Sequence, residues 1–321
     1  MSKRVLGIVL MAGMLTIFGC GRKPQPASSD SDLRGSISIS GAWALYPMTV
    51  LWAQEFCKIH PAVQIDISAG GAGKGMADCL SGAADLGMLS RAVHPAEIEK
   101  GAWPVAVTKD AVVPVASQQN PDLEFLLKRG LTRGQCIDIW ITGNLKTWGQ
   151  LLDTPHTEPI HVYTRSDACG AAEIWANYLG KNQEDLQGIG VFGDPGLAEA
   201  VRKDPLGIGF NNVNYAYDAA SKKPMAGLVV LPLDLNENGR IDPEESFYDT
   251  REQLTAAIAD GRYPSPPARP LYLVSKGKPA KPEVAAFLRW ILQEGQKFVE
   301  EAGYVPLASE TIAQELKKLE P

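Results

Sequence analysis

The first third of the chain alternates between short strand-like runs and longer helix-like runs. Residues 35–40 read GSISIS, in which apolar side chains occupy every second position, as in a half-buried strand. Residues 48–60 (MTVLWAQEFCKIH) instead place apolar side chains three and four positions apart, which is the spacing of an amphipathic helix. A strand-like run at 63–68, a glycine-rich loop, a helical run at 73–82 and a third strand-like run at 84–89 follow. This repetition predicts a parallel sheet covered by helices.

The middle of the chain repeats this order, and its end is mostly helical. A strand-like run at 160–164 leads into a helical run at 171–180, and strand-like runs at 207–210 and 227–233 follow. From residue 282 onward, helical spacing predominates. The predicted fold class is therefore α/β.

Two long extended stretches, 106–117 and 266–277, predict crossings between two lobes. A chain of 321 residues is long enough for two lobes of average size, and two connecting strands would make them a hinged clamp. In parallel α/β sheets, ligands bind at the carboxyl ends of the strands. Loops rich in small residues, 41–47, 69–75 and 165–171, occupy such ends, each just before a helix.

The third of these loops predicts an anion site. It begins with the cation Arg165 and continues with the small residues Ala168, Cys169, Gly170 and Ala171 at the start of a helix. A helix N-terminus presents unpaired N–H groups and about half a positive charge. Small residues let a ligand approach these groups closely, so we expect an anion there.

The first twenty residues predict a lipid-anchored precursor. Two cations precede an apolar run at 5–18, which is short for a membrane-spanning helix. The run ends in LTIFGC, which resembles the lipobox of bacterial lipoproteins; an ordinary signal peptide with a chance cysteine is the alternative. We expect a signal peptide at 1–19, lipid on Cys20 and a Pro/Ser-rich flexible tether at 20–35. The mature protein would then be periplasmic or at the cell surface, attached to the membrane through this lipid alone.

The charge of the chain argues against nucleic acid as a partner. The net charge is −6, and removal of Lys3 and Arg4 with the signal peptide makes it two units more negative. A basic field is therefore absent. The sequence leaves open how the remaining cysteines pair, because they show no CxxC spacing; they are Cys57, Cys79, Cys136 and Cys169.

The sharpest local motif, DLNENGRIDPEE at 234–245, fits the twelve-residue EF-hand calcium loop. Gly239 stands where that loop turns. The flanking runs are not those of EF-hand helices, so we expect a structural calcium ion, with no organic cofactor; an Asn/Gly-rich turn with chance acids is the alternative. Loop positions 1, 3, 5, 7, 9 and 12 are taken by Asp234, Asn236, Asn238, Arg240 (through its carbonyl), Asp242 and Glu245.

Six segments of the chain, in order, resemble a known family. They read SGAWALYP, GGAGKG, ADLGMLSR, IWITGNLKTWGQL, TRSDACGAAE and LRWILQEGQKFVEEAGYVPL. Together they are similar to the phosphate-binding, substrate-binding proteins of ABC importers. The resemblance implies a two-lobed periplasmic-binding-protein fold of type II, with two mixed, mostly parallel sheets flanked by helices and joined by two hinge strands. It places lobe I at 36–112 and 268–321 and lobe II at 113–267. It also implies an ABC permease in the inner membrane as partner; we expect a monomer.

The resemblance also implies a ligand site, and there the chain departs from the family. In the family, hydroxyl groups from three loops donate to phosphate, an arginine pairs with it, and an aspartate accepts a proton from the oxyanion. Arg165 and Asp85 match the last two, but apolar or thiol side chains replace the hydroxyls. Backbone amides, Lys74 and the flat ring of Trp43 would contact the ligand in place of these hydroxyls. We therefore expect an anion larger or less oxygen-dense than phosphate. The expected ligand set is Trp43, Ala44, Ala72, Gly73, Lys74, Asp85, Arg165, Cys169, Gly170 and Ala171.

The leading interpretation is a lipid-anchored extracytoplasmic solute-binding protein, not an enzyme. It would capture an oxyanion, phosphate or a related or larger anion, for an ABC importer. One alternative is an anion sensor lipoprotein without a transporter. Another is a cleft enzyme with Cys169 as nucleophile and His161 or Asp167 as base. His161 lies on the same predicted strand, however, whereas catalytic partners normally come from separate elements.

Overall fold

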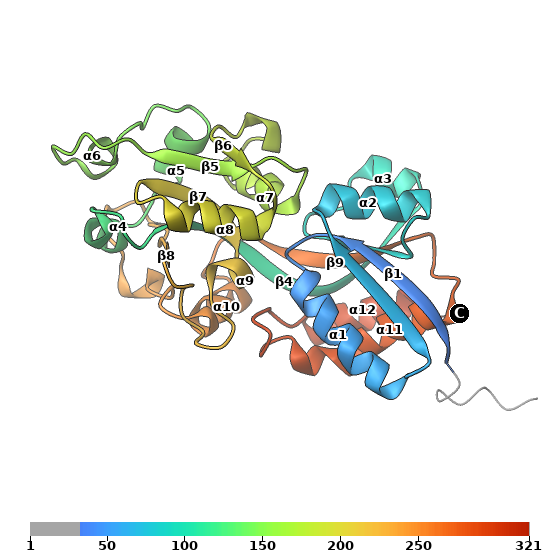
Figure 1. The fold of residues 1–321 in the computed structure, drawn as a ribbon. Helices are drawn as coiled ribbons and strands as arrows, with labels where there is room; N and C mark the ends of the chain where they lie inside the picture. The colour runs from blue at the N-terminus through green and yellow to red at the C-terminus, as the bar shows by residue number, and fades with distance from the viewer. Residues whose placement is uncertain (1–32, 321) are drawn as a thin grey trace, which may run out of the picture.

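The computed structural model describes residues 33–320. The predicted signal peptide (1–19), Cys20 and most of the tether lie outside the described residues. Within them the chain forms two lobes, and two long strands, β4 (Ala102–Ser117) and β9 (Ala268–Lys276), run between the lobes (Figure 1).

Lobe I is built on three parallel strands. β1 (Gly35–Gly41) pairs in parallel with β2 (Val63–Ala69) on one side and β3 (Leu86–Leu89) on the other. The period-two pattern of β1 buries Ile37 and Ile39. The helices of this lobe are α1 (Tyr46–Ile59), α2 (Ala72–Ser81), α3 (Pro95–Glu99), α11 (Pro282–Gln293) and α12 (Ser309–Lys318).

Lobe II repeats the parallel arrangement with β5 (His161–Arg165), which pairs with β6 (Ile189–Val191) and β7 (Gly207–Asn212). β8 (Leu228–Val230) pairs antiparallel with β4. The helices of this lobe are α4 (Leu123–Arg129), α5 (Arg133–Trp140), α6 (Trp148–Leu152), α7 (Gly170–Tyr178), α8 (Gly193–Lys203), α9 (Val213–Ala216) and α10 (Arg251–Asp260).

The sheets of the two lobes are continuous through the antiparallel pair β4–β9. The strand order is β2-β1-β3-β9-β4-β7-β5-β6, with antiparallel pairing at β3–β9, β9–β4 and β4–β7. The register of β4 on β9 shifts between Ala106 and Thr108, and such a bulge bends a strand and increases its twist. The α/β prediction is confirmed, with one refinement: the two predicted sheets are joined into one, and it has antiparallel as well as parallel pairs.

Each lobe has its own aromatic core. In lobe I, Phe56 packs edge-on against Phe287, with 5.1 Å between ring centroids. In lobe II, Trp175 stacks on Phe210 and meets Trp140 edge-on, with centroids 5.8 and 5.2 Å apart. Along β4, side chains up to Val107 join the first core and those from Ala111 onward join the second. The predicted lobe boundaries, 112/113 and 267/268, fall on β4 and at the start of β9.

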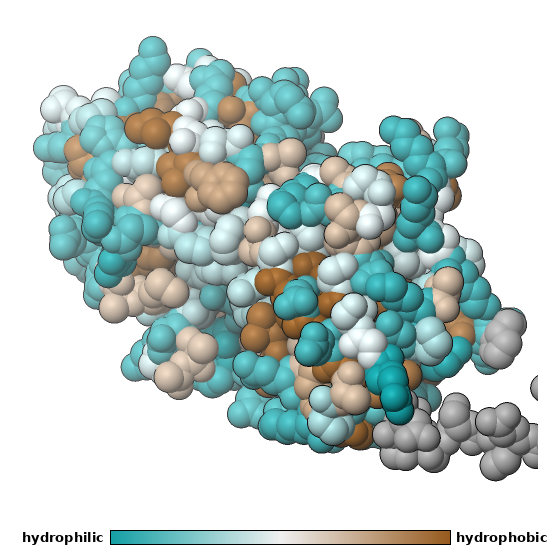
Figure 2. Space-filling model, turned by 45° about the vertical axis from the view of Figure 1, so that its right-hand side comes forward, coloured by the Kyte–Doolittle hydropathy of each residue, from teal (hydrophilic) through white to brown (hydrophobic). Residues whose placement is uncertain are grey.

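On the face shown in Figure 2, hydrophilic residues predominate over both lobes, and smaller hydrophobic patches interrupt them. Among helices within residues 33–320, none combines the length and apolar character that crossing a bilayer requires. The four cysteines in this range, Cys57, Cys79, Cys136 and Cys169, are not paired with one another.

Candidate ligand-binding cleft

The loops rich in small residues, 69–75 of lobe I and 165–171 of lobe II, touch each other at the boundary between the lobes. The amide of Gly73 in lobe I donates to the carbonyl of Ala168 in lobe II at 3.1 Å. Gly71 adopts φ +90°, and a Cβ at this position would lie 2.9 Å from the same carbonyl. A Cβ on Gly170 would lie 2.6 Å from the carbonyl carbon of Ser90. Only glycine lets the two backbones come this close.

Helices α2 and α7 both begin at this contact, and neither is capped by a side-chain oxygen. α2 follows Gly71 without a side-chain cap. At α7, the sulfur of Cys169 accepts from the amide of Ala172 at 3.5 Å, and sulfur is a weak acceptor. The amides of Gly73 and Ala172 are thus already used, which leaves those of Ala72, Gly170 and Ala171 at the helix starts for a bound anion.

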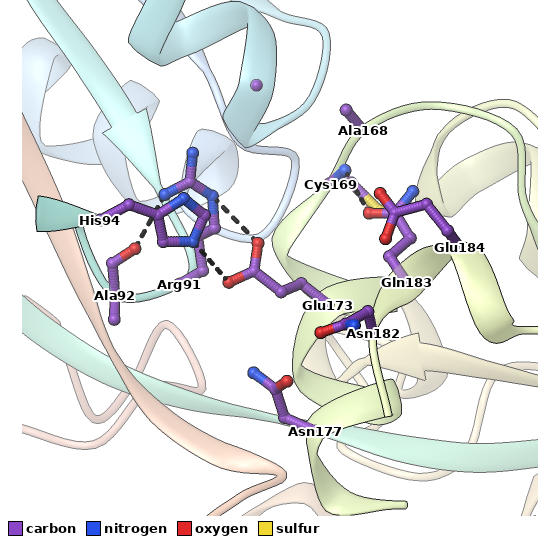
Figure 3. A pocket seen from close by; sticks show the side chains of 11 residues that line it. Arg91, Ala92, His94, Ala168, Cys169, Glu173, Asn177, Asn182, Gln183 and Glu184 are labelled. Atoms are coloured by element: carbon purple, nitrogen blue, oxygen red, sulfur yellow. Dashed lines mark hydrogen bonds and ion pairs between the residues drawn. The ribbon is translucent and has the colours of Figure 1, made fainter. Parts of the chain in front are cut away.

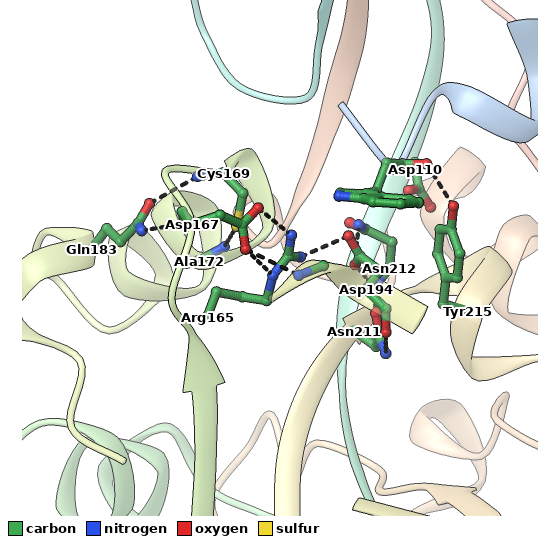
Figure 4. A network of polar contacts seen from close by, with 12 residues as sticks. Asp110, Arg165, Asp167, Cys169, Ala172, Gln183, Asp194, Asn211, Asn212 and Tyr215 are labelled. Atoms are coloured by element: carbon green, nitrogen blue, oxygen red, sulfur yellow. Dashed lines mark hydrogen bonds and ion pairs between the residues drawn. The ribbon is translucent and has the colours of Figure 1, made fainter. Parts of the chain in front are cut away.

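Arg165, at the end of β5, lies behind these helix starts, and each of its three guanidinium nitrogens donates to a carboxylate (Figure 4). Its Nε and Nη2 donate to Asp167 at 2.8 and 2.6 Å, and its Nη1 donates to Asp194 at 2.7 Å. The side chain is only 1% exposed. Burial acts to lower the pKa of Arg165, but the negative charges of Asp194 and Asp167 outweigh it and raise this pKa above its usual range.

A second buried ion pair lies on the two crossing strands. Arg269 Nη1 lies 3.8 Å from Asp110 Oδ2, and Arg269 Nε donates to the carbonyl of Ser90 at 3.2 Å. Burial raises the pKa of Asp110 to about 6, and the charge of Arg269 offsets part of this increase. Arg269 also donates to the side chain of Asn212, which connects this pair to the network around Arg165.

A cavity of about 510 Å³ opens beside the loop contact, between the lobes. Gly73, at the start of α2, forms part of its wall, and so does Cys169 at the start of α7 (Figure 3 shows Cys169). Polar contacts cross it from lobe I to Glu173 on α7: the Arg91 Nε forms an ion pair and the His94 Nε2 a hydrogen bond, each 3.2 Å from a Glu173 oxygen. The remaining lining residues are Ala92, Ala168, Asn177, Asn182, Gln183 and Glu184.

Part of the predicted ligand set lies at this cavity or directly behind it. Gly73 and Cys169 line the cavity, whereas Ala72, Gly170 and Ala171 are buried at the two helix starts. The Trp43 ring lies against Gly193 of lobe II and meets Phe192 edge-on, with centroids 6.4 Å apart, so it packs across the interface. Ala44 is inside lobe I, where its carbonyl accepts from the hydroxyl of Tyr304 at 2.7 Å.

Asp85 is not part of this site, and that prediction is wrong. It directly precedes β3, and its carboxylate accepts from the amide of Ser38 at 2.9 Å and pairs with Lys281 at 2.9 Å. This is the amino end of a parallel strand, whereas the loops lie at the carboxyl ends. Lys74 also points away from lobe II, since its ammonium pairs with Asp78 and donates to Ser40 Oγ at 2.7 Å.

The geometry argues against the alternative of a Cys169 nucleophile. Burial raises the pKa of the Cys169 thiol to about 12, which disfavours the reactive thiolate at neutral pH. His161 lies at the opposite end of β5 from Arg165 and pairs with Asp204 at 2.7 Å. Asp167 is held by Arg165. No base is therefore free to activate this thiol from the predicted positions.

The 234–245 loop folds tightly around its own carboxylates. Asp234 accepts from the amides of Asn238 and Gly239 at 3.2 and 2.8 Å, and Glu245 accepts from the amide of Leu235 at 2.8 Å. Gly239 has φ +83°, as the predicted turn requires. Within residues 33–320, no group of three or more His, Cys, Asp or Glu side chains is gathered closely enough to hold a metal. Calcium ligands also include amide and carbonyl oxygens, which this loop has at Asn236, Asn238 and Arg240, so its residues fit calcium in kind.

Sequence reasoning missed Asp194, Arg269 and Asp110 altogether. A usable signal existed for Asp194, because it follows β6 and stands in the first turn of α8, as Cys169 and Ala72 stand at the starts of α7 and α2. Arg269 and Asp110 lie within strands whose sequence shows only extended structure, and the β4–β9 pairing alone brings them together.

Comparisons with known proteins agree with this architecture. A family model described as the PBP superfamily domain matches residues 26–294. The phosphate-binding protein PstS of Methanocaldococcus jannaschii is 26% identical over 347 aligned residues, covering 91% of this chain and 88% of that protein. PstS of Pseudomonas aeruginosa PAO1 is 28% identical over 319 residues, covering 90% and 88%.

Solved structures show the same fold. A putative phosphate ABC transporter substrate-binding protein from Clostridium perfringens, solved with bound phosphate, matches with a TM-score of 0.69 and 22% identity, over 85% of this chain and all of that one. An ABC-type phosphate transport receptor from Vibrio cholerae matches with a TM-score of 0.61 and 19% identity, over 84% and 100%. The predicted two-lobed fold and the prediction of a binding protein rather than an enzyme are confirmed. The chain belongs to the PBP superfamily, and it is similar to phosphate-binding, substrate-binding proteins of ABC importers.

Proposed function

We propose that this protein captures an oxyanion between its lobes and delivers it to an ABC importer. The ligand is phosphate or a related or larger anion. The observation that carries the proposal is the interlobe cavity, because its wall contains the starts of two helices, α2 and α7, from different lobes. An anion in this cavity contacts both helix starts at once, so it stabilises the closed arrangement of the lobes.

The size and charge of the cavity favour a ligand larger than inorganic phosphate. About 510 Å³ is in the range of sites for small organic ligands. Arg91 is already held by Glu97 through two hydrogen bonds, at 2.9 and 2.6 Å. In the cavity wall itself, the amide of Gly73 donates to Ala168 and the amide of Cys169 donates to Gln183 Oε1. Neutral side chains such as Asn177 and Asn182 are therefore the main donors that the wall offers to a ligand.

Isothermal titration of the purified protein with a panel of anions tests this function. The panel contains phosphate, sulfate, phosphonates and small organic phosphates and carboxylates. We expect at least one member to bind with 1:1 stoichiometry and to raise the melting temperature. Absence of binding and of any thermal shift across the panel would exclude the function.

The predicted location of the protein completes the proposal. Lipid on Cys20 and the tether up to residue 35 would keep the two lobes within reach of a permease in the inner membrane, while the body remains in the periplasm or at the cell surface. The alternative of a sensor without a transporter has the same cleft. Anion uptake by cells that lack this protein separates the two alternatives. Uptake falls if the protein is a component of the importer, and it is unchanged if the protein is a sensor without a transporter.

A bound calcium ion at 234–245 is expected to stabilise lobe II without contacting the ligand. The loop lies on the chain between β8 and α10, and none of its residues lines the cavity. We expect EDTA to lower the melting temperature and calcium to restore it, with anion affinity almost unchanged. Differential scanning fluorimetry of the wild-type protein and of Glu245→Gln measures the effect. Coincident melting curves with EDTA and with calcium would remove the metal from the account.

A further inference from the structure

Arg165, which the sequence predicted to pair with the anion, already has a carboxylate partner on each side. Asp167 takes the Nε/Nη2 edge of Arg165 and Asp194 takes Nη1. Both carboxylates come from lobe II, as Arg165 does, so the pairing does not depend on closure of the cleft. An incoming anion that approached Nη1 would have to compete with Asp194 for this nitrogen and would meet its negative charge.

Asp194 is held so firmly that displacement is unfavourable. Its Oδ1 accepts from the side-chain amide of Asn212 at 2.5 Å, and its own carbonyl accepts from the side-chain amide of Asn211 at 3.0 Å. Only 2% of its side chain is exposed. A carboxylate with this burial and these partners cannot swing out to solvent without leaving polar groups unpaired.

Lobe I covers this network and defines when an anion could reach it. A Cβ on Gly71 would lie 2.9 Å from Asp167 Oδ2, and a Cβ on Gly193, the neighbour of Asp194, would lie 3.3 Å from the Trp43 ring. Separation of the lobes removes both covers. An anion that enters the open cleft then meets Arg165 together with two carboxylates, which is a net negative group rather than a positive one.

We propose that Asp194 is a specificity-determining residue: as the internal counter-ion of Arg165, it excludes free inorganic phosphate from the arginine and leaves the cleft to larger anions that bind at the helix starts. This inference deepens the proposed function and rests on it in so far as the cleft binds anions. What is new is the role of one carboxylate, that of Asp194.

The variant Asp194→Asn isolates that role. Asparagine has the same shape, and its side-chain oxygen can still accept from Asn212. Its amide nitrogen cannot accept from Arg165 Nη1, so this N–H group becomes available to phosphate. A charge-assisted hydrogen bond and the loss of one repulsive charge predict a gain in phosphate affinity of about 10- to 100-fold.

A matched control is Asp204→Asn, which removes the same charge at the other end of α8. Asp204 follows the last helical residue there and pairs with His161. We expect its phosphate affinity to equal that of wild type. The double variant Asp194→Asn/Arg165→Gln should lose the gain, because the freed N–H group is then absent.

The test is a titration with inorganic phosphate of four proteins, each first shown to melt cooperatively. They are the wild type, Asp194→Asn, Asp204→Asn and the double variant. A gain in Asp194→Asn that the double variant abolishes and Asp204→Asn does not share supports the proposal. Phosphate affinity that is unchanged or weaker in Asp194→Asn overturns it. If the proposal is overturned but the wild-type protein binds some anion of the panel, the proposed function still stands. If neither the wild-type protein nor Asp194→Asn binds any anion of the panel, the proposed function is overturned as well.

Discussion

Replacing Gly170 with alanine is expected to weaken anion binding strongly while both lobes remain folded. Gly170 is the first residue of α7, where alanine is a better helix former than glycine. The added methyl group would, however, lie 2.6 Å from the carbonyl carbon of Ser90 in the opposite lobe. The lobes would have to stay apart, and the two helix starts could no longer contact one ligand.

The expected loss of affinity is at least about 100-fold, because a closed state that is destabilised by about 3 kcal/mol lowers the apparent affinity by that factor. Gly134→Ala is the matched control. Gly134 also lies in the first turn of a helix, α5, and a Cβ there would meet only Thr132 Oγ1, at 3.8 Å. Calorimetric titration with the best anion of the panel measures both variants. Equal affinity in the two alanine variants would show that contact between Gly170 and Ser90 plays no part in binding.

Replacing Arg165 with alanine is expected to destabilise lobe II by about 3–5 kcal/mol, because two buried carboxylates, Asp167 and Asp194, would lose their common cation. Arg202→Ala is the control. Arg202 lies in the same lobe and pairs with Glu199, but both side chains are 43% exposed. Exposed pairs contribute little, so we expect a change within about 1 kcal/mol. Urea denaturation followed by circular dichroism gives both values.

A second comparison separates lost charge pairing from lost packing. Adding Asp194→Asn to Arg165→Ala removes one of the unpaired carboxylates, so the double variant should be more stable than Arg165→Ala alone. If the double variant is less stable instead, the destabilisation comes from the cavity left by the side chain and not from unpaired charge.

Periodicity predicted most of the elements because those elements bury one face. β1 alternates and buries Ile37 and Ile39, and the helical spacing of 48–60 corresponds to α1, which buries Trp52 and Phe56. Short elements with a weak pattern were missed: α3 has no buried residue, and the three residues of β6 are half-buried or exposed. Their positions follow from tertiary contacts that a local pattern does not contain.

The candidate site was predictable only in part, for a similar reason. Small residues before a helix indicate a close backbone approach, and Gly73, Cys169 and Gly170 do lie where the lobes meet. The partner of a charged residue, in contrast, cannot be predicted from the local sequence. Nothing local shows that Arg165 meets Asp194, which is 29 positions away, or that Asp85 lies at the wrong end of β3 for a ligand. Both depend on which strand ends the sheet brings together.

The pairing of Arg165 adds to the differences between this chain and the family that it resembles. Apolar and thiol side chains at the loop positions remove hydroxyl donors, and Asp194 occupies an N–H group of the arginine. Both changes act in the same direction, since each weakens a site for a small, oxygen-dense anion. Amide groups at the starts of α2 and α7 are affected by neither change.

The position of a bound anion in a crystal structure tests the central claim most directly. Crystals grown with the tightest-binding anion of the panel should show it in the interlobe cavity, within hydrogen-bond distance of amides at the starts of α2 and α7, with the lobes closed over it. An anion found only at an exposed surface group, such as Lys281 beside Asp85, with the interlobe cavity holding none, would contradict the account.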